Sequence, residues 1–103
     1  MNSFIYIDNN STKINIVIRD NYNKKLVFDG FISDKMLSFG HVNALVSDNT
    51  LDVLIVYVSE DFRGMGLASF LMQAIIDYSK ENNYNIIPTC PYAKKYLEKT
   101  IKF

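Results

Sequence analysis

Hydrophobic and polar positions alternate with a period of about two through the first half of the chain, which is typical of β-strands. Polar clusters such as Asp8-Asn9-Asn10-Ser11 separate the apolar runs, so neighbouring runs are predicted to pair as hairpins. Gly30 interrupts the third run and is predicted to mark a β-bulge. The four predicted strands are Ser3–Asp8, Lys13–Arg19, Leu26–Ile32 and Met36–Val46.

The run from Leu51 to Val58 differs from these four because it is almost continuously apolar. Continuous apolarity predicts burial on both faces, and hence a strand inside the sheet rather than at its edge. The residues before it, Ser47-Asp48-Asn49-Thr50, form a tight-turn signal. The run is therefore predicted to form a hairpin with the preceding strand.

A helical period replaces the strand pattern after this run. Glu81-Asn82-Asn83 is predicted to end the helix, and Tyr84–Pro88 to form a last strand. Pro91 then opens a second helix that runs to about Lys102. Because a strand-helix-strand crossover makes its two strands parallel, we expect an α/β (α+β) fold with a mixed, mostly antiparallel sheet. The apolar face of the first helix consists of Leu67, Phe70, Leu71, Ala74, Ile75 and Tyr78.

Length and composition exclude several classes of protein. A chain of 103 residues predicts a single domain over residues 1–103. Eleven basic and eleven acidic residues balance, so nothing favours nucleic acid or a membrane surface, and the apolar runs are too short to span a bilayer. A single cysteine cannot form an internal disulfide, which favours a reducing, cytoplasmic setting.

The most informative chemistry lies where the long helix begins, at Arg63-Gly64-Met65-Gly66. The first N–H groups of a helix lack intrahelical partners and its dipole is positive there, which suits an anion such as phosphate. Glycine also lets a ligand approach the backbone closely. A P-loop is excluded because the chain has no G-x-x-x-x-G-K-[ST] string. The dinucleotide pattern G-x-G-x-x-G fails because Ser69 stands at its third glycine.

Arg63 to Ala68 instead matches [QR]-x-x-G-x-[GA], the pyrophosphate loop of the GNAT superfamily of acetyl-CoA-dependent acyltransferases. The string I-I-P-T-C-P-Y-A-K-K-Y-L-E-K follows the helix. Together they make Leu51–Lys99 resemble the minimal single-domain GNAT-like N-acetyltransferases with a C-P-[YF] motif. The resemblance implies a minimal GNAT fold, acetyl-CoA (coenzyme A) as co-substrate, no metal, and transfer of acetyl to an unidentified amine.

The resemblance also implies roles for individual residues around the loop. The backbone of Val56, Tyr57 and Val58 would pair with the pantetheine arm of CoA, as an added strand does. Arg63 would orient or neutralise the pyrophosphate. The N–H groups that would hold the pyrophosphate belong to Gly64, Met65, Gly66, Leu67, Ala68 and Ser69.

Cys90 and Tyr92 would lie near the thioester. Cys90 is predicted at the N-terminus of the last helix, which stabilises a thiolate. Two routes stay open: an amine attacks the thioester directly, or Cys90 takes the acetyl group first. In the alternative without chemistry, Cys90 is a small buried core residue. Tyr92 is expected to contact CoA and is a candidate acid for the departing thiolate, whereas Tyr96 is expected in the core.

Direct attack requires a base that takes a proton from the amine. Relatives carry H-T-x-V before the loop, but the corresponding residues here are Ile55-Val56-Tyr57-Val58. The only histidine, His41, lies on the preceding strand, and a hairpin turning at Asp48-Asn49 would place it opposite about Val56. His41 is a candidate base or a structural histidine. Two acidic residues beside the loop are further candidates or solvated surface groups: Glu60 and Asp61.

Two other functions stay open beside acetyl transfer. The missing histidine of the H-T pair suggests a CoA-binding protein without turnover, and a small interaction module could keep the fold for its surface. The acceptor, a small molecule or a protein amine, is not indicated by the sequence. Neither nucleic acid nor a membrane is expected as a partner. We expect a monomer or a homodimer, because exposed sheet edges can pair with a second copy.

Overall fold

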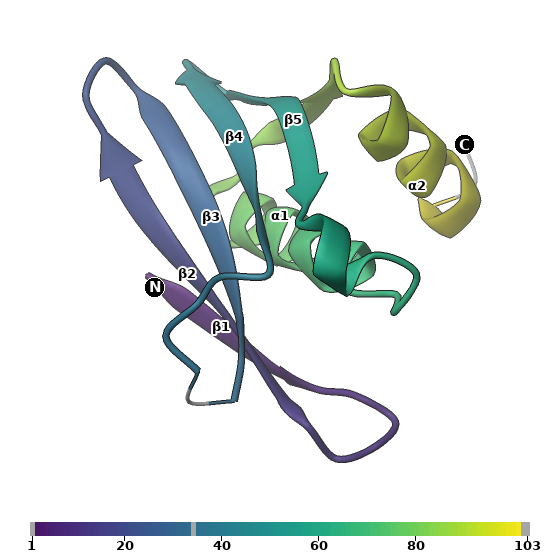
Figure 1. Ribbon diagram of the computed structural model, residues 1–103. Coiled ribbons are helices and arrows are strands. Elements are labelled where there is room, and N and C mark those ends of the chain that lie inside the picture. The colour runs from purple at the N-terminus through teal and green to yellow at the C-terminus, as the bar shows by residue number, and fades with distance from the viewer. Residues whose placement is uncertain (1, 34, 102–103) are drawn as a thin grey trace.

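The computed structural model describes residues 2–33 and 35–101, which form a six-stranded sheet with helices behind it (Figure 1). The strands lie across the sheet in chain order, antiparallel as far as β5, and β6 is parallel to β5. This confirms the predicted mixed, mostly antiparallel α+β fold. The strands are β1 (Ser3–Ile7), β2 (Lys13–Asn21), β3 (Lys25–Ile32), β4 (Gly40–Ser47), β5 (Thr50–Val58) and β6 (Asn85–Pro88).

The helical segments follow β5, as the change of period predicts. They are the 3₁₀ turn η1 (Glu60–Phe62), α1 (Ala68–Asn82) and α2 (Pro91–Ile101). Helix α1 ends at Asn83, whose φ of 58° is left-handed and whose N–H donates to the Ser79 carbonyl. Pro91 is the first residue of α2, as predicted, while Lys102, the predicted end of that helix, lies outside the described residues.

The core forms between α1 and one face of the sheet. Strands β2 to β5 bury alternate residues on this face, because side chains alternate across a strand. Helix α1 lies across the same face (Figure 1). We call the other side the helix-free face. The buried residues that fill the space between the sheet and α1 include Ile14, Ile16, Phe28, Val42, Val53, Leu71, Met72 and Ile75.

The predicted bulge at Gly30 is wrong. Gly30 pairs in regular register with both neighbouring strands, and its missing side chain makes room for Phe39, whose ring would lie 2.3 Å from a Cβ there. The register irregularity lies between β4 and β5 instead. Asn43 pairs with Ile55 while Ala44 pairs with Val53, so Leu54 is the extra residue.

The predicted burial of Leu51–Val58 on both faces is also wrong. Strand β5 does lie inside the sheet, between β4 and β6, and Leu51 and Val53 are fully buried against α1. Ile55 and Tyr57 point to the helix-free face, where they are 50% and 42% exposed. The apolar run reflects burial on one side and an apolar surface on the other.

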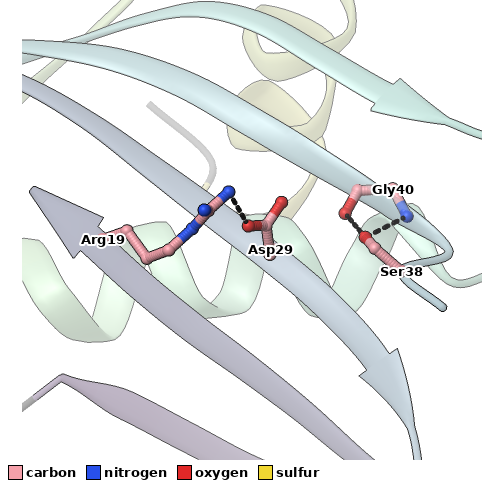
Figure 2. Close-up of polar contacts among 4 residues, drawn as sticks. All are labelled: Arg19, Asp29, Ser38 and Gly40. Carbon is pink, nitrogen blue, oxygen red and sulfur yellow. Dashed lines mark hydrogen bonds and ion pairs between the residues drawn. The ribbon is translucent and has the colours of Figure 1, made fainter. Parts of the chain in front are cut away.

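Strand β4 begins at Gly40 rather than at the predicted Met36. Met36 lies in the loop before the strand and is exposed. The loop closes onto Gly40 through Ser38, whose hydroxyl donates to the Gly40 carbonyl at 2.8 Å and accepts its N–H at 3.2 Å (Figure 2). On the helix-free face nearby, Arg19 of β2 and Asp29 of β3 point toward each other and form an ion pair (Figure 2).

None of the helices in residues 2–33 and 35–101 combines the length and apolarity needed to cross a membrane.

Candidate functional site

The loop between β5 and α1 depends on two glycines for its path. Gly64 and Gly66 have φ angles of 81° and 76°, in the left-handed region that other residues rarely adopt. A Cβ on either glycine would have no heavy atom within 4 Å, so the backbone conformation, and not a lack of room, requires glycine. Because both glycines are exposed, the loop presents its backbone to solvent.

A run of N–H groups at this loop has no protein acceptor. In the described part of the chain, hydrogen bonds donated by backbone N–H groups resume at Phe70, which donates to the Leu67 carbonyl at 3.1 Å. The Ser69 hydroxyl donates to the Gly66 carbonyl at 2.7 Å and holds the loop against the first turn of α1. These donors and the positive end of α1 together suit an anion. The acceptor-free groups belong to Gly64, Met65, Gly66, Leu67, Ala68 and Ser69.

Arg63 lies back along the end of β5. Its Nε donates to the Val58 carbonyl at 2.8 Å, and its guanidinium carbon lies 5.7 Å from the centroid of the Tyr57 ring. The Val58 carbonyl belongs to the backbone that is expected to pair with pantetheine. Pairing at that carbonyl would share its oxygen with Arg63 Nε, since a carbonyl oxygen can accept two hydrogen bonds.

Strands β5 and β6 separate at a point that we call the fork, between Val53 and Pro88. Their parallel pairing runs from Thr50 with Asn85 to Val53 with Pro88 and stops there. The Cys90 N–H then donates to the Val53 carbonyl at 2.9 Å. Strand β5 continues to Val58 without β6 beside it. Its last residues therefore have an edge without a strand partner, which can accept an extended chain.

Cys90 closes the fork with its backbone and keeps its side chain in the core. Its carbonyl accepts the N–H of Lys94 at 3.0 Å, so it is the residue that precedes α2, as predicted. Its side chain is only 8% exposed and belongs to the main hydrophobic cluster. Cys90 therefore combines the position at a helix start with the burial of a core cysteine.

Asp52 also lies at the fork, although no sequence motif includes it. It lies on β5 between Leu45 of β4 and Ile87 of β6, on the helix-free face. The Thr89 hydroxyl donates to Asp52 Oδ1 at 2.5 Å. Asp52 precedes Val53, and Thr89 precedes Cys90, so this polar pair adjoins the hydrogen bond that closes the fork. One signal was available: Asp52 is the only acidic residue within the apolar run Leu51–Val58.

Comparison with known protein families shows the family of the chain. A sequence model of GCN5-related N-acetyltransferases matches residues 36–103, which is more than half of the chain and includes β4, β5, the glycine loop, α1, β6 and α2. The chain belongs to the GCN5-related N-acetyltransferase family. No curated protein matched the chain.

A GCN5-related N-acetyltransferase that uses direct attack needs its base beside the acceptor, so the position of His41 matters. His41 lies one residue from the predicted position opposite about Val56: it pairs with Tyr57, and the two ring centroids are 5.3 Å apart. The extra residue Leu54 shifts the register by one. Tyr57 lies four residues beyond Val53, about 13 Å along the strand. The structure therefore does not bring His41 and Cys90 together. Two exposed acidic residues lie farther along in η1: Glu60 and Asp61.

Tyr92 lies in the first turn of α2, two residues after Cys90, and is 41% exposed. Its ring centroid is 6.3 Å from that of Tyr96, which packs against the core as predicted. Partial burial, and next the neighbouring Tyr96, raise the pKa of the Tyr92 phenol above its usual value. The hydroxyl therefore stays protonated at neutral pH and can donate a proton or a hydrogen bond.

A cavity of about 820 Å³ lies away from these residues, between the C-terminal half of α1, β6 and α2. Its lining includes Ser79, Tyr84, Ile86 and Leu97, and none of the expected site residues. The C-terminal end of a helix carries partial negative charge, which disfavours a pyrophosphate. The candidate site is therefore the glycine loop and the fork. Among the described residues, no group of three or more His, Cys, Asp or Glu could hold a metal ion.

Proposed function

We propose that this chain is an acetyl-CoA-dependent N-acetyltransferase of the minimal type with a C-P-[YF] motif, acting on a primary amine. The observation that carries the proposal is the run of acceptor-free N–H groups from Gly64 to Ser69 at the start of α1. It directly follows a strand whose last residues have an unpaired edge. Membership of the GCN5-related N-acetyltransferase family supports the pyrophosphate of CoA as the anion in this proposal.

The residues fit a ligand with a charged end and an extended arm. The N–H groups of residues 64–69 would hold the pyrophosphate, and the edge of Val56–Val58 would pair with the pantetheine arm. From Val58 back to Val53 the strand covers five residues, or about 17 Å. An extended arm that follows this edge from the loop would bring the thioester to the fork, beside Thr89 and Cys90.

The chemistry requires a proton acceptor and a proton donor at the fork. Acetyl-CoA supplies the acetyl group as a thioester, which is activated toward an amine. In our proposal a carboxylate oxygen of Asp52, oriented by the Thr89 hydroxyl, takes the proton that the amine nitrogen loses. The carbon–nitrogen bond forms as the carbon–sulfur bond breaks. The sulfur leaves as a thiolate, and the Tyr92 hydroxyl supplies its proton.

Direct transfer is favoured over an acetyl-cysteine intermediate. A nucleophilic thiol must reach the carbonyl carbon, but the Cys90 side chain is packed in the core and 8% exposed. Its role in our proposal is to close the fork through its N–H and to contact the acetyl end. His41 would act on the distal part of the site, beside Tyr57, rather than on Cys90.

Calorimetric titration with acetyl-CoA tests the proposal, with Gly66→Ala as the informative variant. Alanine at a φ of 76° is strained, and its Cβ projects into the space where the ligand is expected, so we predict at least tenfold weaker binding. The matched control is Asn23→Ala, which also places alanine at a positive φ, in the turn between β2 and β3. We expect the control to lose a similar amount of stability and to keep its affinity.

The outcomes separate the three functions. An absence of binding at millimolar acetyl-CoA contradicts the proposal and leaves the interaction module. Binding without release of the CoA thiol over a panel of amines favours the CoA-binding protein without turnover. Equal affinity in the wild type and Gly66→Ala means that the glycine loop does not hold the ligand.

A further inference from the structure

Asp52 is the only formally charged side chain at the outward positions of β4, β5 and β6. Those positions alternate with the buried ones, and their register places Asp52 between Leu45 and Ile87, with Ile55 in the next row. Thr89 occupies Oδ1 of the carboxylate. Oδ2 has no hydrogen-bond or ion-pair partner in the described part of the chain. This oxygen can accept a hydrogen bond from a cation.

The cations on the same face do not neutralise Asp52. Arg19 of β2 already forms an ion pair with Asp29 of β3, and β3 lies two strands away from β5, which carries Asp52. Lys25 stands in the same row as Asp52 on the far side of Leu45, about 10 Å away between Cα atoms, and no ion pair joins the two among the described residues. A single uncompensated carboxylate therefore faces solvent at the fork.

The surface around this carboxylate is mostly apolar, with Asn43 of β4 as a polar neighbour of Ile55. Ile87, beside Asp52 on β6, is 43% exposed, and Ile55, in the next row of β5, is 50% exposed. Tyr57 continues the surface toward the loop. Burying these side chains under a ligand is favourable at about 25 cal/mol per Å² of apolar area. A ligand that satisfies both features has one positive charge and an apolar body next to it.

We propose that the acceptor is a primary amine on an apolar body, bound as its ammonium form by Asp52 and packed on Ile55 and Ile87. The inference rests on the proposed acetyl transfer and specifies its substrate class. The ammonium donates to Oδ2 of Asp52, and the alkyl or aryl part covers the helix-free face. Before attack the ammonium loses one proton to solvent and becomes the nucleophilic amine, and Asp52 takes the second proton as the carbon–nitrogen bond forms. A polyamine or an aminoglycoside does not fit, because its further ammonium groups would lie on isoleucine side chains without a counter-charge.

The test compares two acceptors of the same length, hexylamine and 1,6-diaminohexane, with acetyl-CoA saturating and the acetylated product measured by mass spectrometry. We expect kcat/KM to be at least tenfold higher for hexylamine, because the second ammonium must be desolvated. Along the series ethylamine, butylamine and hexylamine, kcat/KM should rise about two- to fourfold per methylene. Ile55→Ser and Ile87→Ser should flatten this rise, while Asp52→Asn should weaken binding of every amine.

The matched control is Ile5→Ser on β1, which removes an isoleucine of similar exposure, 58%, from the opposite edge of the sheet. It should leave the rise per methylene unchanged. A readout independent of turnover is a ¹H–¹⁵N NMR titration with hexylamine, in which residues 52, 55 and 87 should shift.

Three results overturn the inference: equal or better use of 1,6-diaminohexane, an unchanged methylene series in Ile55→Ser, or NMR shifts confined to other regions. If acetyl-CoA still binds in the calorimeter, any of these results contradicts only the substrate class. If the protein does not bind acetyl-CoA, the result contradicts the proposed acetyl transfer itself.

Discussion

At the scale of single residues, the site depends on contacts between positions far apart in the chain. Asp52 and Thr89 are separated by 37 residues and meet because β6 returns parallel to β5. Thr89 is not unusual in its own segment, whereas Asp52 is the only acidic residue of the apolar run Leu51–Val58. A carboxylate in an apolar strand costs free energy unless it is hydrogen-bonded, so the Thr89 hydroxyl helps to explain why Asp52 is tolerated there.

Cys90→Ala distinguishes the two routes of acetyl transfer. Because the thiol is buried and the backbone N–H that closes the fork is kept, we expect release of the CoA thiol to fall less than about tenfold. Incubation of the wild-type protein with acetyl-CoA should give no acetylated Cys90 in the mass spectrum. An acetyl adduct on Cys90, together with loss of activity in Cys90→Ala and Cys90→Ser, would show the covalent route instead.

At the scale of elements, one extra residue decides what faces the site. Without Leu54, the hairpin that turns at Asp48-Asn49 would pair His41 with Val56; with it, His41 pairs with Tyr57. A shift of one residue in a strand also exchanges the two faces of the sheet. The bulge thus keeps Val53 and Val56 toward α1 and turns Ile55 and Tyr57 to the helix-free face.

Gly30→Ala tests the contact between Gly30 of β3 and the ring of Phe39, the residue before β4. Three atoms of the Phe39 ring lie within 2.8 Å of the position of the added Cβ, and Phe39 is fully buried. We expect the free energy of unfolding to fall by about 1–3 kcal/mol in urea denaturation. The loss of unfolding free energy should be smaller when Gly30→Ala is introduced into the Phe39→Leu variant, which lacks the ring. An equal loss in both backgrounds would assign the effect to the strand backbone rather than to the ring.

At the scale of the whole molecule, a polar cluster ties the edge strand β1 to helix α1. The Tyr6 hydroxyl donates to Asp77 of α1 at 2.6 Å, and the Gln73 amide donates to the other oxygen of Asp77 at 3.1 Å. Burial first, and then Asp77 through its hydrogen bond, raises the pKa of the Tyr6 phenol well above its usual range. This contact joins residues that are 71 positions apart in the chain.

Tyr6→Phe should lower the free energy of unfolding by about 1–2 kcal/mol at pH 7, since a hydrogen bond to a carboxylate is lost. The pKa of Tyr6 is higher in the folded protein than in the unfolded chain. Its contribution is therefore complete below pH 10 and is lost as the pH rises further, because the unfolded chain ionises first. The difference between the wild type and Tyr6→Phe should accordingly shrink above about pH 10.

Urea denaturation at pH 7 and at alkaline pH measures both effects. The control is Tyr22→Phe, because Tyr22 is 92% exposed and its hydroxyl should contribute less than about 0.5 kcal/mol. A difference between wild type and Tyr6→Phe that stays constant across this pH range would contradict the assignment to the phenol.

The elements that could be predicted are those with a local signal. The helical period, the polar run Glu81-Asn82-Asn83 and Pro91 mark where α1 ends and α2 begins, and all three agree with the structure. The glycine loop is local too, because the φ angles of Gly64 and Gly66 are open to glycine and to few other residues. Gly30 shows the limit: the sequence indicates a special position there, but only Phe39 explains it.

The sequence by itself determined the order and direction of the strands, the long helix and the glycine loop before it, because alternation, helical period and glycine conformation act over a few residues. The tertiary structure decided the rest. The bulge at Leu54, the fork at Val53 and Pro88, and the meeting of Asp52 with Thr89 depend on how separate strands pack and pair. Register and burial are properties of two or more segments together, so no single segment contains them.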